Sequence, residues 1–238
     1  MKKVIGIVAL MAATGTAYAS NNIDISSLTS QSDFRLFSED MGSALSYKSL
    51  LPAEPLGVTG FDVGVEATVT NLANTALYGK VTGNSSISTL VVPKVHIDKG
   101  LPFGIDVGAF ISQVPNSNIK LTGAEVRYAF IEGGVAMPAV AVRATYTKLT
   151  GVKQLDFNTT GIELTASKGI LMFTPYAGIG EVWVDSTPNN VGTLKAEKFT
   201  EAKYYVGTNI NLGLMNFDLE ADKTGKDTSY GLKVGFRF

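Results

Sequence analysis

The sequence predicts an all-β protein: an antiparallel transmembrane β-barrel of about ten strands, with twelve as the alternative, and an N-terminal amphipathic helix. Polar and apolar residues alternate with a period of two through most of the chain. Short glycine-containing turns and longer connections rich in Asn, Ser, Thr and Gly separate the alternating segments. The last segment alternates strictly and ends in Phe238. These three observations favour the barrel.

The first residues have the three parts of a secretory signal peptide. Two lysines open the chain, an apolar run follows over residues 4–13, and a small-x-small motif ends at Ala19, directly before Ser20. The apolar run is too short to span a bilayer. We therefore predict that residues 1–19 are a signal peptide, that the export machinery is a partner, and that cleavage falls between Ala19 and Ser20.

The composition fits a folded, exported chain. Of 238 residues, 45% are hydrophobic and 17% are charged, so there is enough apolar surface to bury. Cysteine is absent, which excludes disulfides and thiolate metal sites. The formal net charge of −1 shows no basic excess, so we expect no nucleic-acid partner.

Residues 20–58 form a separate N-terminal segment that does not alternate. Between Gln31 and Leu45, apolar residues recur at helical spacing, with polar residues on the other side. Ser30 is a candidate N-cap, and Asp33 three residues later fits a weak capping box. We therefore predict an amphipathic helix, followed by an extended link.

Three arrangements of this segment are open. The helix could rest against the periplasmic rim of the barrel, or the segment could be a plug that enters the lumen. Alternatively, residues 33–38 and 43–49 could form a hairpin, which would raise the strand count to twelve.

The alternation identifies individual strands. In residues 61–69, odd positions are apolar, while even positions are acidic, Gly or Thr. A helix does not fit, because residues two apart lie on opposite helix faces. Within about three residues at each end, the ten predicted strands are 59–70, 88–98, 103–114, 118–131, 137–149, 152–166, 170–185, 197–211, 214–223 and 227–238.

The connections alternate in character. The tight turns are 99–102, 132–136, 167–169 and 212–213, and the long connections are 71–87 and 186–196. Three further connections, at 115–117, 150–151 and 224–226, are short. Short periplasmic turns and longer extracellular loops are typical of a transmembrane barrel. We therefore expect the two long loops outside the cell and the tight turns in the periplasm.

A soluble periplasmic ligand-binding barrel would alternate as well, with its apolar face inward. Two features favour the membrane instead. The polar faces are poor in lysine, and aromatic residues fall near strand ends, as in the two girdles of a membrane barrel. The aromatic residues near the predicted periplasmic end are Phe103, Phe130, Phe173, Phe217 and Phe236, and those near the other end are Tyr146, Trp183 and Phe199.

The last strand resembles the C-terminal strand of Gram-negative outer-membrane β-barrel proteins. Its alternate positions are Tyr230, Leu232, Val234, Phe236 and Phe238. The resemblance covers residues 59–238 as a pattern and identifies no particular porin or receptor family. It implies a location in the outer membrane of a Gram-negative bacterium, with outer-membrane lipid and the barrel-assembly machinery as partners. The oligomeric state is unknown.

The polar face of the predicted strands carries eight acids and five bases. The acids are Asp62, Glu66, Asp106, Glu125, Glu163, Glu201, Asp218 and Glu220, and the bases are Arg127, Arg143, Lys203, Lys233 and Arg237. Buried charges must pair or meet water. Barrels of about eight strands are filled by side chains, whereas open channels need about 16 strands. A salt-bridge network in a narrow lumen is therefore favoured over a weakly cation-preferring pore.

Catalysis has little support in the sequence. The single histidine, His96, lies two residues from Asp98 beside a predicted turn, and we interpret it as an interfacial residue. Histidines and carboxylates show no transition-metal spacing, so we expect neither a metal nor a cofactor, although calcium on loop carboxylates is open.

The sequence therefore predicts a non-enzymatic integral membrane barrel with a narrow or plugged charged lumen and a role in structure or small-solute passage. The alternatives are a small-solute or ion transporter pore and a soluble periplasmic ligand-binding barrel.

Overall fold

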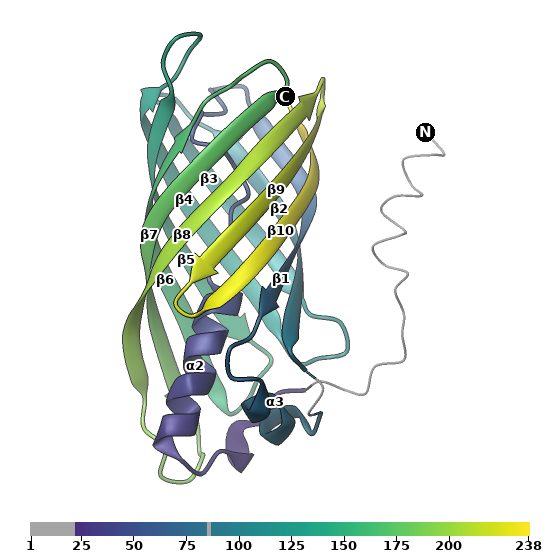
Figure 1. Ribbon diagram of the computed structural model, residues 1–238, viewed down its shortest axis with the longest axis vertical. Coiled ribbons are helices and arrows are strands. Elements are labelled where there is room, and N and C mark those ends of the chain that lie inside the picture. The colour runs from purple at the N-terminus through teal and green to yellow at the C-terminus, as the bar shows by residue number, and fades with distance from the viewer. Residues whose placement is uncertain (1–21, 85–86) are drawn as a thin grey trace, which may run out of the picture.

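The computed structural model describes residues 22–84 and 87–238 and is a closed antiparallel barrel of ten strands (Figure 1). Neighbours in the barrel are neighbours in sequence, and β1 and β10 close it. This confirms the predicted fold class, and the twelve-strand alternative is wrong. The predicted signal peptide and its cleavage site at Ala19 and Ser20 lie outside the described residues. Within those residues, no helix is long and apolar enough to cross a membrane.

All ten strands lie within three residues of their predicted bounds. They are β1 (Phe61–Asn71), β2 (Thr89–Gly100), β3 (Ile105–Gln113), β4 (Lys120–Glu132), β5 (Ala139–Thr150), β6 (Leu155–Ser167), β7 (Phe173–Pro188), β8 (Glu197–Leu212), β9 (Met215–Thr224) and β10 (Asp227–Arg237). The helical elements are the 3-10 helix η1 (Ile25–Ser27), α2 (Gln31–Leu45) and α3 (Thr75–Thr82). The tight turns lie together at one end of the barrel, and the helices lie at the other (Figure 1).

The chain end completes the barrel. The main chains of Phe61 and Phe238 exchange two hydrogen bonds, of 2.7 and 3.1 Å between nitrogen and oxygen. Their rings stack with centroids 5.6 Å apart. Closure matters because an unpaired strand edge in hydrocarbon leaves backbone groups without partners, at several kcal/mol each.

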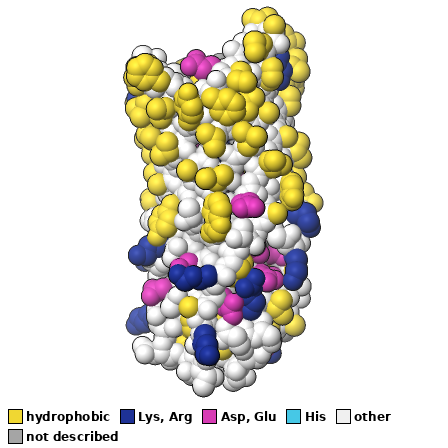
Figure 2. All heavy atoms as spheres, turned by 90° about the vertical axis from the view of Figure 1, so that its left-hand side faces the viewer, with side chains coloured by type: hydrophobic (Ala, Val, Ile, Leu, Met, Phe, Trp, Pro, Cys, Tyr) yellow, Lys and Arg dark blue, Asp and Glu magenta, His cyan; other side chains and the backbone are white. Residues whose placement is uncertain are grey.

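The outer surface near the tight turns is apolar. Val126 points outward with 51% of its surface exposed, while the next residue, Arg127, is 1% exposed. Ile162 and Glu163 on β6 repeat this contrast. Figure 2 shows the apolar belt over the upper part of the barrel. This distribution is the reverse of that in a soluble barrel, so the barrel spans a lipid bilayer and the soluble ligand-binding alternative does not hold.

Towards the loop end the polarity reverses. Lys120 is exposed on the outside of β4, whereas its neighbour Leu121 is 2% exposed on the inside. Inward apolar residues such as Leu121 and Phe157 form a core with Phe34 and Phe37 of α2. Charged side chains gather on the outside of this part of the barrel (Figure 2). The loop end therefore packs like a soluble protein and continues the barrel beyond the apolar belt.

The N-terminal segment threads the barrel. Helix α2 enters at the loop end, and residues 41–53 are all buried. The chain then emerges near the tight turns, where Gly100 donates a main-chain hydrogen bond to Gly60 at 3.0 Å, just before β1. The rim and hairpin arrangements are therefore wrong, because the segment runs along the lumen without joining the sheet.

The start of α2 differs from the predicted capping box. Ser30 is the N-cap, but its side chain makes no capping hydrogen bond and lies 2.6 Å from the hydroxyl of Ser32. Asp33 instead pairs with Lys80 of α3 at 2.7 Å. Gly42, an unfavourable residue within a helix, is explained by close packing. A Cβ there would lie 2.7 Å from Val184 Cγ2.

Helix α3 lies in the predicted long loop 71–87 and was not expected from the sequence. Leu77, Tyr78 and Val81 are its buried residues, and Gly83 ends it with a left-handed φ of 71°. The chain before α2 lies against α3, since Asp24 donates a main-chain hydrogen bond to the carbonyl of Val81 at 2.8 Å. The loop end is therefore covered by helices.

Candidate functional site

The lumen is the site that the sequence points to, and the structure places the thirteen predicted charges on its inner face. Twelve of them are buried, and the side chain of Arg237 is 19% exposed. Most of them meet a partner of opposite charge. Glu201 and Glu220 are in no ion pair among the residues the structure describes. The inward face thus holds a network in which most charges are neutralised within the wall.

One half of the network surrounds Asp62 on β1. Its carboxylate lies 3.3 Å from Lys233 Nζ and 2.8 Å from Arg237 Nη2, both on β10. Asn216 donates a hydrogen bond to it at 3.0 Å, and His96 Nε2 lies 2.9 Å away. Asp62 therefore ties the closing strand to its neighbours.

The interpretation of His96 as an interfacial residue is wrong. His96 is 3% exposed and faces the lumen, because Val95 and Ile97 occupy the outward positions of β2. With Asp62 and Asp98 it forms a group whose ligand atoms lie within 4.8 Å of one another. Spacing in sequence did not reveal this group, because pairing of β1 with β2 places Asp62 opposite Asp98.

This histidine–carboxylate group has donor atoms that metals accept. However, Asp62 is already paired with Lys233 and Arg237, whose charges would compete with a cation. The arrangement therefore fits a hydrogen-bonded closure of the barrel better than it fits a metal centre.

A second part of the network spans β3 to β8. Arg127 pairs with Asp106 at 2.6 Å. Arg143 lies 3.0 Å from Glu163 and 3.3 Å from Glu125. Lys203 also pairs with Glu163, at 2.6 Å. These cations thus pair with acids of the wall, and each has a further donor directed into the lumen.

The sequence reasoning missed further charges that face the lumen, among them Lys94, Lys48 and Asp222. Lys94 lies 3.3 Å from Glu66, and Lys48 pairs with Asp222 at 2.8 Å. The alternation of β2 could have placed Lys94 on the inward face, and the alternation of β9 could have placed Asp222 there, because both residues follow the period of two. Lys48 carries no such signal, because it lies on the extended segment inside the barrel.

The segment inside the lumen is bound through its main chain. Four lumenal cations donate to four of its carbonyl groups: Lys203 to Tyr47 at 2.7 Å, Lys94 to Lys48 at 2.7 Å, Arg143 to Leu51 at 3.2 Å and Arg127 to Pro52 at 2.7 Å. In return, wall oxygens accept two main-chain N–H groups, from Ala53 to Ser167 Oγ at 3.1 Å and from Leu56 to Asp106 Oδ1 at 3.1 Å. The segment therefore occupies the lumen and is held by both cations and oxygens of the wall.

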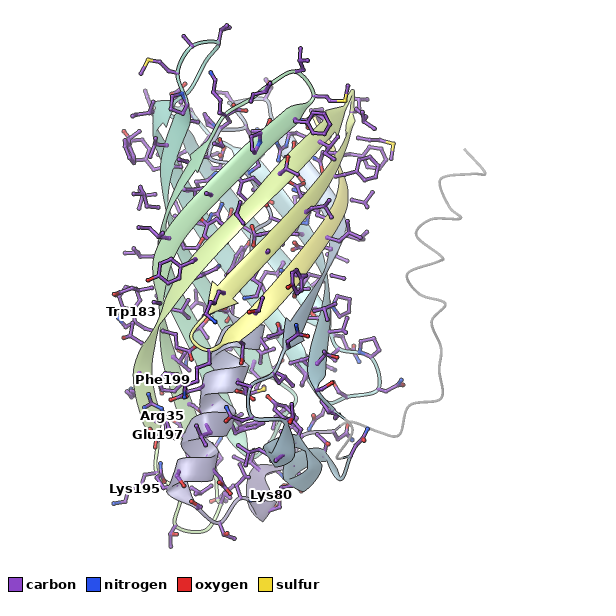
Figure 3. All side chains as sticks on the ribbon, viewed as in Figure 1. Arg35, Lys80, Trp183, Lys195, Glu197 and Phe199 are labelled. Carbon is purple, nitrogen blue, oxygen red and sulfur yellow. The ribbon has the colours of Figure 1, made fainter. Side chains whose placement is uncertain are left out.

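Helix α2 is also held at the loop end. Figure 3 shows Arg35 beside Phe199 and Glu197 of β8. The guanidinium carbon lies 3.9 Å from the centre of the Phe199 ring, and Nη1 lies 3.2 Å from Glu197. Burial raises the pKa of the Asp40 carboxyl on the same helix, while hydrogen bonds from Asn74, which precedes α3, oppose the rise. These contacts fix the helix in the mouth.

Most of the aromatic residues predicted to form girdles lie on the outside of the barrel. Phe199 is the exception, because it faces inward and packs against the core around α2. Phe103 is 85% exposed beside a tight turn, and Phe130 and Phe173 are about half exposed. Trp183 points outward on the opposite side of the belt, as Figure 3 shows. Their exposure fits aromatic side chains at the two lipid–water interfaces.

The comparisons with known proteins find similar solved structures but no family. No family model and no curated protein matches the chain. The solved structures that resemble it include the KdgM porin in complex with disordered oligogalacturonate, at 8% identity and a TM-score of 0.41, covering 74% of this chain and 99% of that one. The outer membrane protein OprG from Pseudomonas aeruginosa follows at 10% identity and a TM-score of 0.35, covering 78% and 99%. Ail, the attachment invasion locus protein of Yersinia pestis, has 12% identity and a TM-score of 0.31, covering 75% and 97%.

The class of the protein follows from the barrel itself. A closed antiparallel sheet satisfies every strand edge, its outer belt is apolar, and its inner face is charged. The strand that closes it carries alternate apolar residues to a terminal phenylalanine. The chain is an integral outer-membrane β-barrel protein of Gram-negative type.

Proposed function

We propose that the protein is a non-enzymatic outer-membrane barrel with a structural role, whose lumen is closed by its own N-terminal segment. The observation that carries this proposal is the continuous burial of residues 41–53 inside the barrel. Main-chain hydrogen bonds from four wall cations hold this segment. The single histidine is enclosed in the lumen, where a substrate from solution would have to displace the segment first.

The surroundings proposed for this barrel are outer-membrane lipid around the apolar belt and the barrel-assembly machinery during insertion. The last strand supports both. Tyr230, Leu232 and Phe236 are exposed on the outside of β10, where lipid or an assembly partner can contact them. Export machinery would act on the predicted signal peptide.

The direct test is a conductance measurement on the full chain in a planar lipid bilayer. A closed lumen predicts no discrete conductance steps under an applied voltage. Folding is checked first by heat-modifiable migration on a gel, so that a silent bilayer is not a misfolded sample. Steady conductance steps from the folded, intact chain would contradict the proposal.

Small-solute passage is a second candidate, favoured by the mixed charge of the wall. If residues 22–56 leave the lumen, acids and bases such as Glu163 and Arg143 line the space that they vacate. A variant that lacks residues 22–56 should then show conductance steps that the intact chain lacks. Equal currents from the two folded proteins would contradict the hypothesis that this segment gates solute passage.

A further inference from the structure

We infer that the lumen is a binding site for a polypeptide main chain, and that it takes a peptide supplied from solution when its own segment is removed. The wall cations direct their donor groups at the main chain of the threaded segment. Four of them donate to carbonyl oxygens of the threaded segment at 2.7–3.2 Å. Hydrogen bonds from a charged donor are the strong class, about twice as strong as neutral ones.

The donors are held in place by the wall and not by the segment. Asp106 fixes Arg127, and Glu163 fixes both Arg143 and Lys203. Glu66 lies 3.3 Å from Lys94. Removing the segment therefore leaves these cations paired with their carboxylates, each with a donor still directed into the lumen. Such a site is prepared for its ligand before the ligand arrives.

The wall also offers acceptors for the peptide N–H groups. Ser167 and Asp106 accept hydrogen bonds from Ala53 and Leu56. Recognition of both carbonyl and N–H groups is specific for a polypeptide, whereas a simple anion would use the cations alone. Pro52 and Ala53 have no polar side-chain groups, so the contacts along this stretch come from the main chain.

Two side-chain positions add selectivity. Lys48 pairs with the buried Asp222 at 2.8 Å. Two residues later, Leu50 packs against Gly231 of β10, where a Cβ would lie 2.7 Å from Leu50 Cδ2. The preferred ligand is therefore a peptide with a basic residue and, two positions on, an apolar residue. Its backbone turns at the apolar residue, where Leu50 has a left-handed φ of 46°. Its N-terminal end points to the loop end of the barrel, as the chain's own segment does (Figure 1).

The experiment starts from the full chain, with a site-specific protease sequence inserted between Val58 and Thr59. This link is exposed at the tight-turn end, and Val58 is 61% exposed. Cleavage after folding leaves the segment in the lumen without a covalent connection to β1. The cleaved segment is displaced in urea and its loss is checked by mass spectrometry. The refolded barrel is then mixed with a fluorescent peptide of residues 46–56, and uptake is followed by fluorescence anisotropy.

A second peptide distinguishes main-chain recognition from side-chain recognition. It keeps every side chain but is N-methylated at Ala53 and Leu56, whose main-chain N–H groups donate to the wall. We expect its dissociation constant to rise about tenfold or more, because the methyl groups remove both donors. Uptake of neither peptide, or equal binding of the two, would overturn the inference.

Variants of the wall provide the matched comparison. Lys94→Met removes one donor to the segment, and we expect it to weaken peptide binding about tenfold. Lys148→Met changes an exposed lysine on the outside of β5 and should leave binding unchanged. Equal binding by the two folded variants would contradict the assigned role of Lys94. Closure is tested separately by the conductance of the intact, uncleaved chain in a planar bilayer. A barrel that is closed in that test but takes up no peptide after cleavage rejects this inference and leaves the proposed function standing.

Discussion

Arg127 donates a 2.7 Å hydrogen bond from Nη1 to the main-chain carbonyl of Pro52, and so connects the barrel wall to the segment that fills it. The same guanidinium pairs with Asp106 on the neighbouring strand. Arg127 is 1% exposed, so water cannot replace either partner. One side chain thus satisfies a carboxylate of the wall and an acceptor of the segment.

Replacing Arg127 should therefore be costly. Arg127→Met leaves Asp106 as a buried, unpaired charge, and we expect a loss of about 3–5 kcal/mol in the free energy of unfolding. Arg127→Lys should lose less, because an ammonium group still neutralises Asp106 but lacks the planar fork that reaches both partners. Urea unfolding from lipid vesicles measures both values. Equal losses in the two variants would show that the planar guanidinium of Arg127 gives no advantage over an ammonium group in contacting Asp106 and Pro52.

The absence of cysteine allows a clean test of topology. Thr29→Cys and Thr193→Cys place single, exposed thiols at the loop end, and Ala136→Cys places one in an exposed tight turn. A membrane-impermeant maleimide should label the first two on intact cells. It should label the third only after the outer membrane is permeabilised.

The pattern of labelling separates two errors. Labelling of Ala136→Cys on intact cells, with Thr193→Cys protected, would mean that the barrel is inverted. Labelling of Thr193→Cys together with protection of Thr29→Cys would mean that the N-terminal segment does not reach the cell surface.

The sequence predicted the barrel well because alternation is a local property. Each strand was found within three residues, and the spacing of apolar residues gave α2 its observed bounds, Gln31–Leu45. The same alternation assigned the thirteen lumen charges to one face. Alternation also contained a signal that was not used: in β2, Lys94, His96 and Asp98 share the face opposite Val95 and Ile97.

Other features depend on contacts between distant parts of the chain. The path of residues 46–56 is set by hydrogen bonds to β2, β4, β5 and β8, which no local pattern encodes. The reversal of polarity along the barrel, with Leu121 inward and Val126 outward, depends on where the apolar belt ends. Helix α3 left a faint signal in Leu77, Tyr78 and Val81 before Gly83, but eight residues are too few for periodicity to decide.

The packing of α2 should depend on its buried ring more than on its exposed charge. Phe37 is 0% exposed and lies 5.7 Å from the Tyr78 ring of α3. Phe37→Ala should cost about 3–5 kcal/mol of stability. Arg35→Ala, two residues away on the same helix and partly exposed, should cost about 1 kcal/mol or less. Hydrogen exchange over residues 31–45 shows whether the loss is local, and similar exchange in the two variants would contradict the burial of Phe37.

Deleting Phe238 should impair insertion more than a terminal truncation usually does, since chain ends tend to tolerate change. The deletion removes two main-chain hydrogen bonds to Phe61 and the stacked ring. Phe238→Tyr keeps both and is the matched control. The folded fraction in the outer membrane, read from heat-modifiable migration, should fall for the deletion alone. Equal folded fractions would exclude a special role for the last residue.

The register of the segment in the lumen can be tested by enlarging one residue of the contact between Gly231 and Leu50 and truncating the other. A Cβ at position 231 would lie 2.7 Å from Leu50 Cδ2, so Gly231→Val overfills the space between β10 and the segment. We expect a loss of about 1–3 kcal/mol. Leu50→Ala alone should also destabilise the protein, because Leu50 is 0% exposed and its truncation leaves a cavity. The double variant should recover much of the loss, because the valine occupies the volume that the leucine vacates. Additive losses in a double-mutant cycle would show that Leu50 and Gly231 are not in contact, and the segment would then have to pass through the barrel in another register.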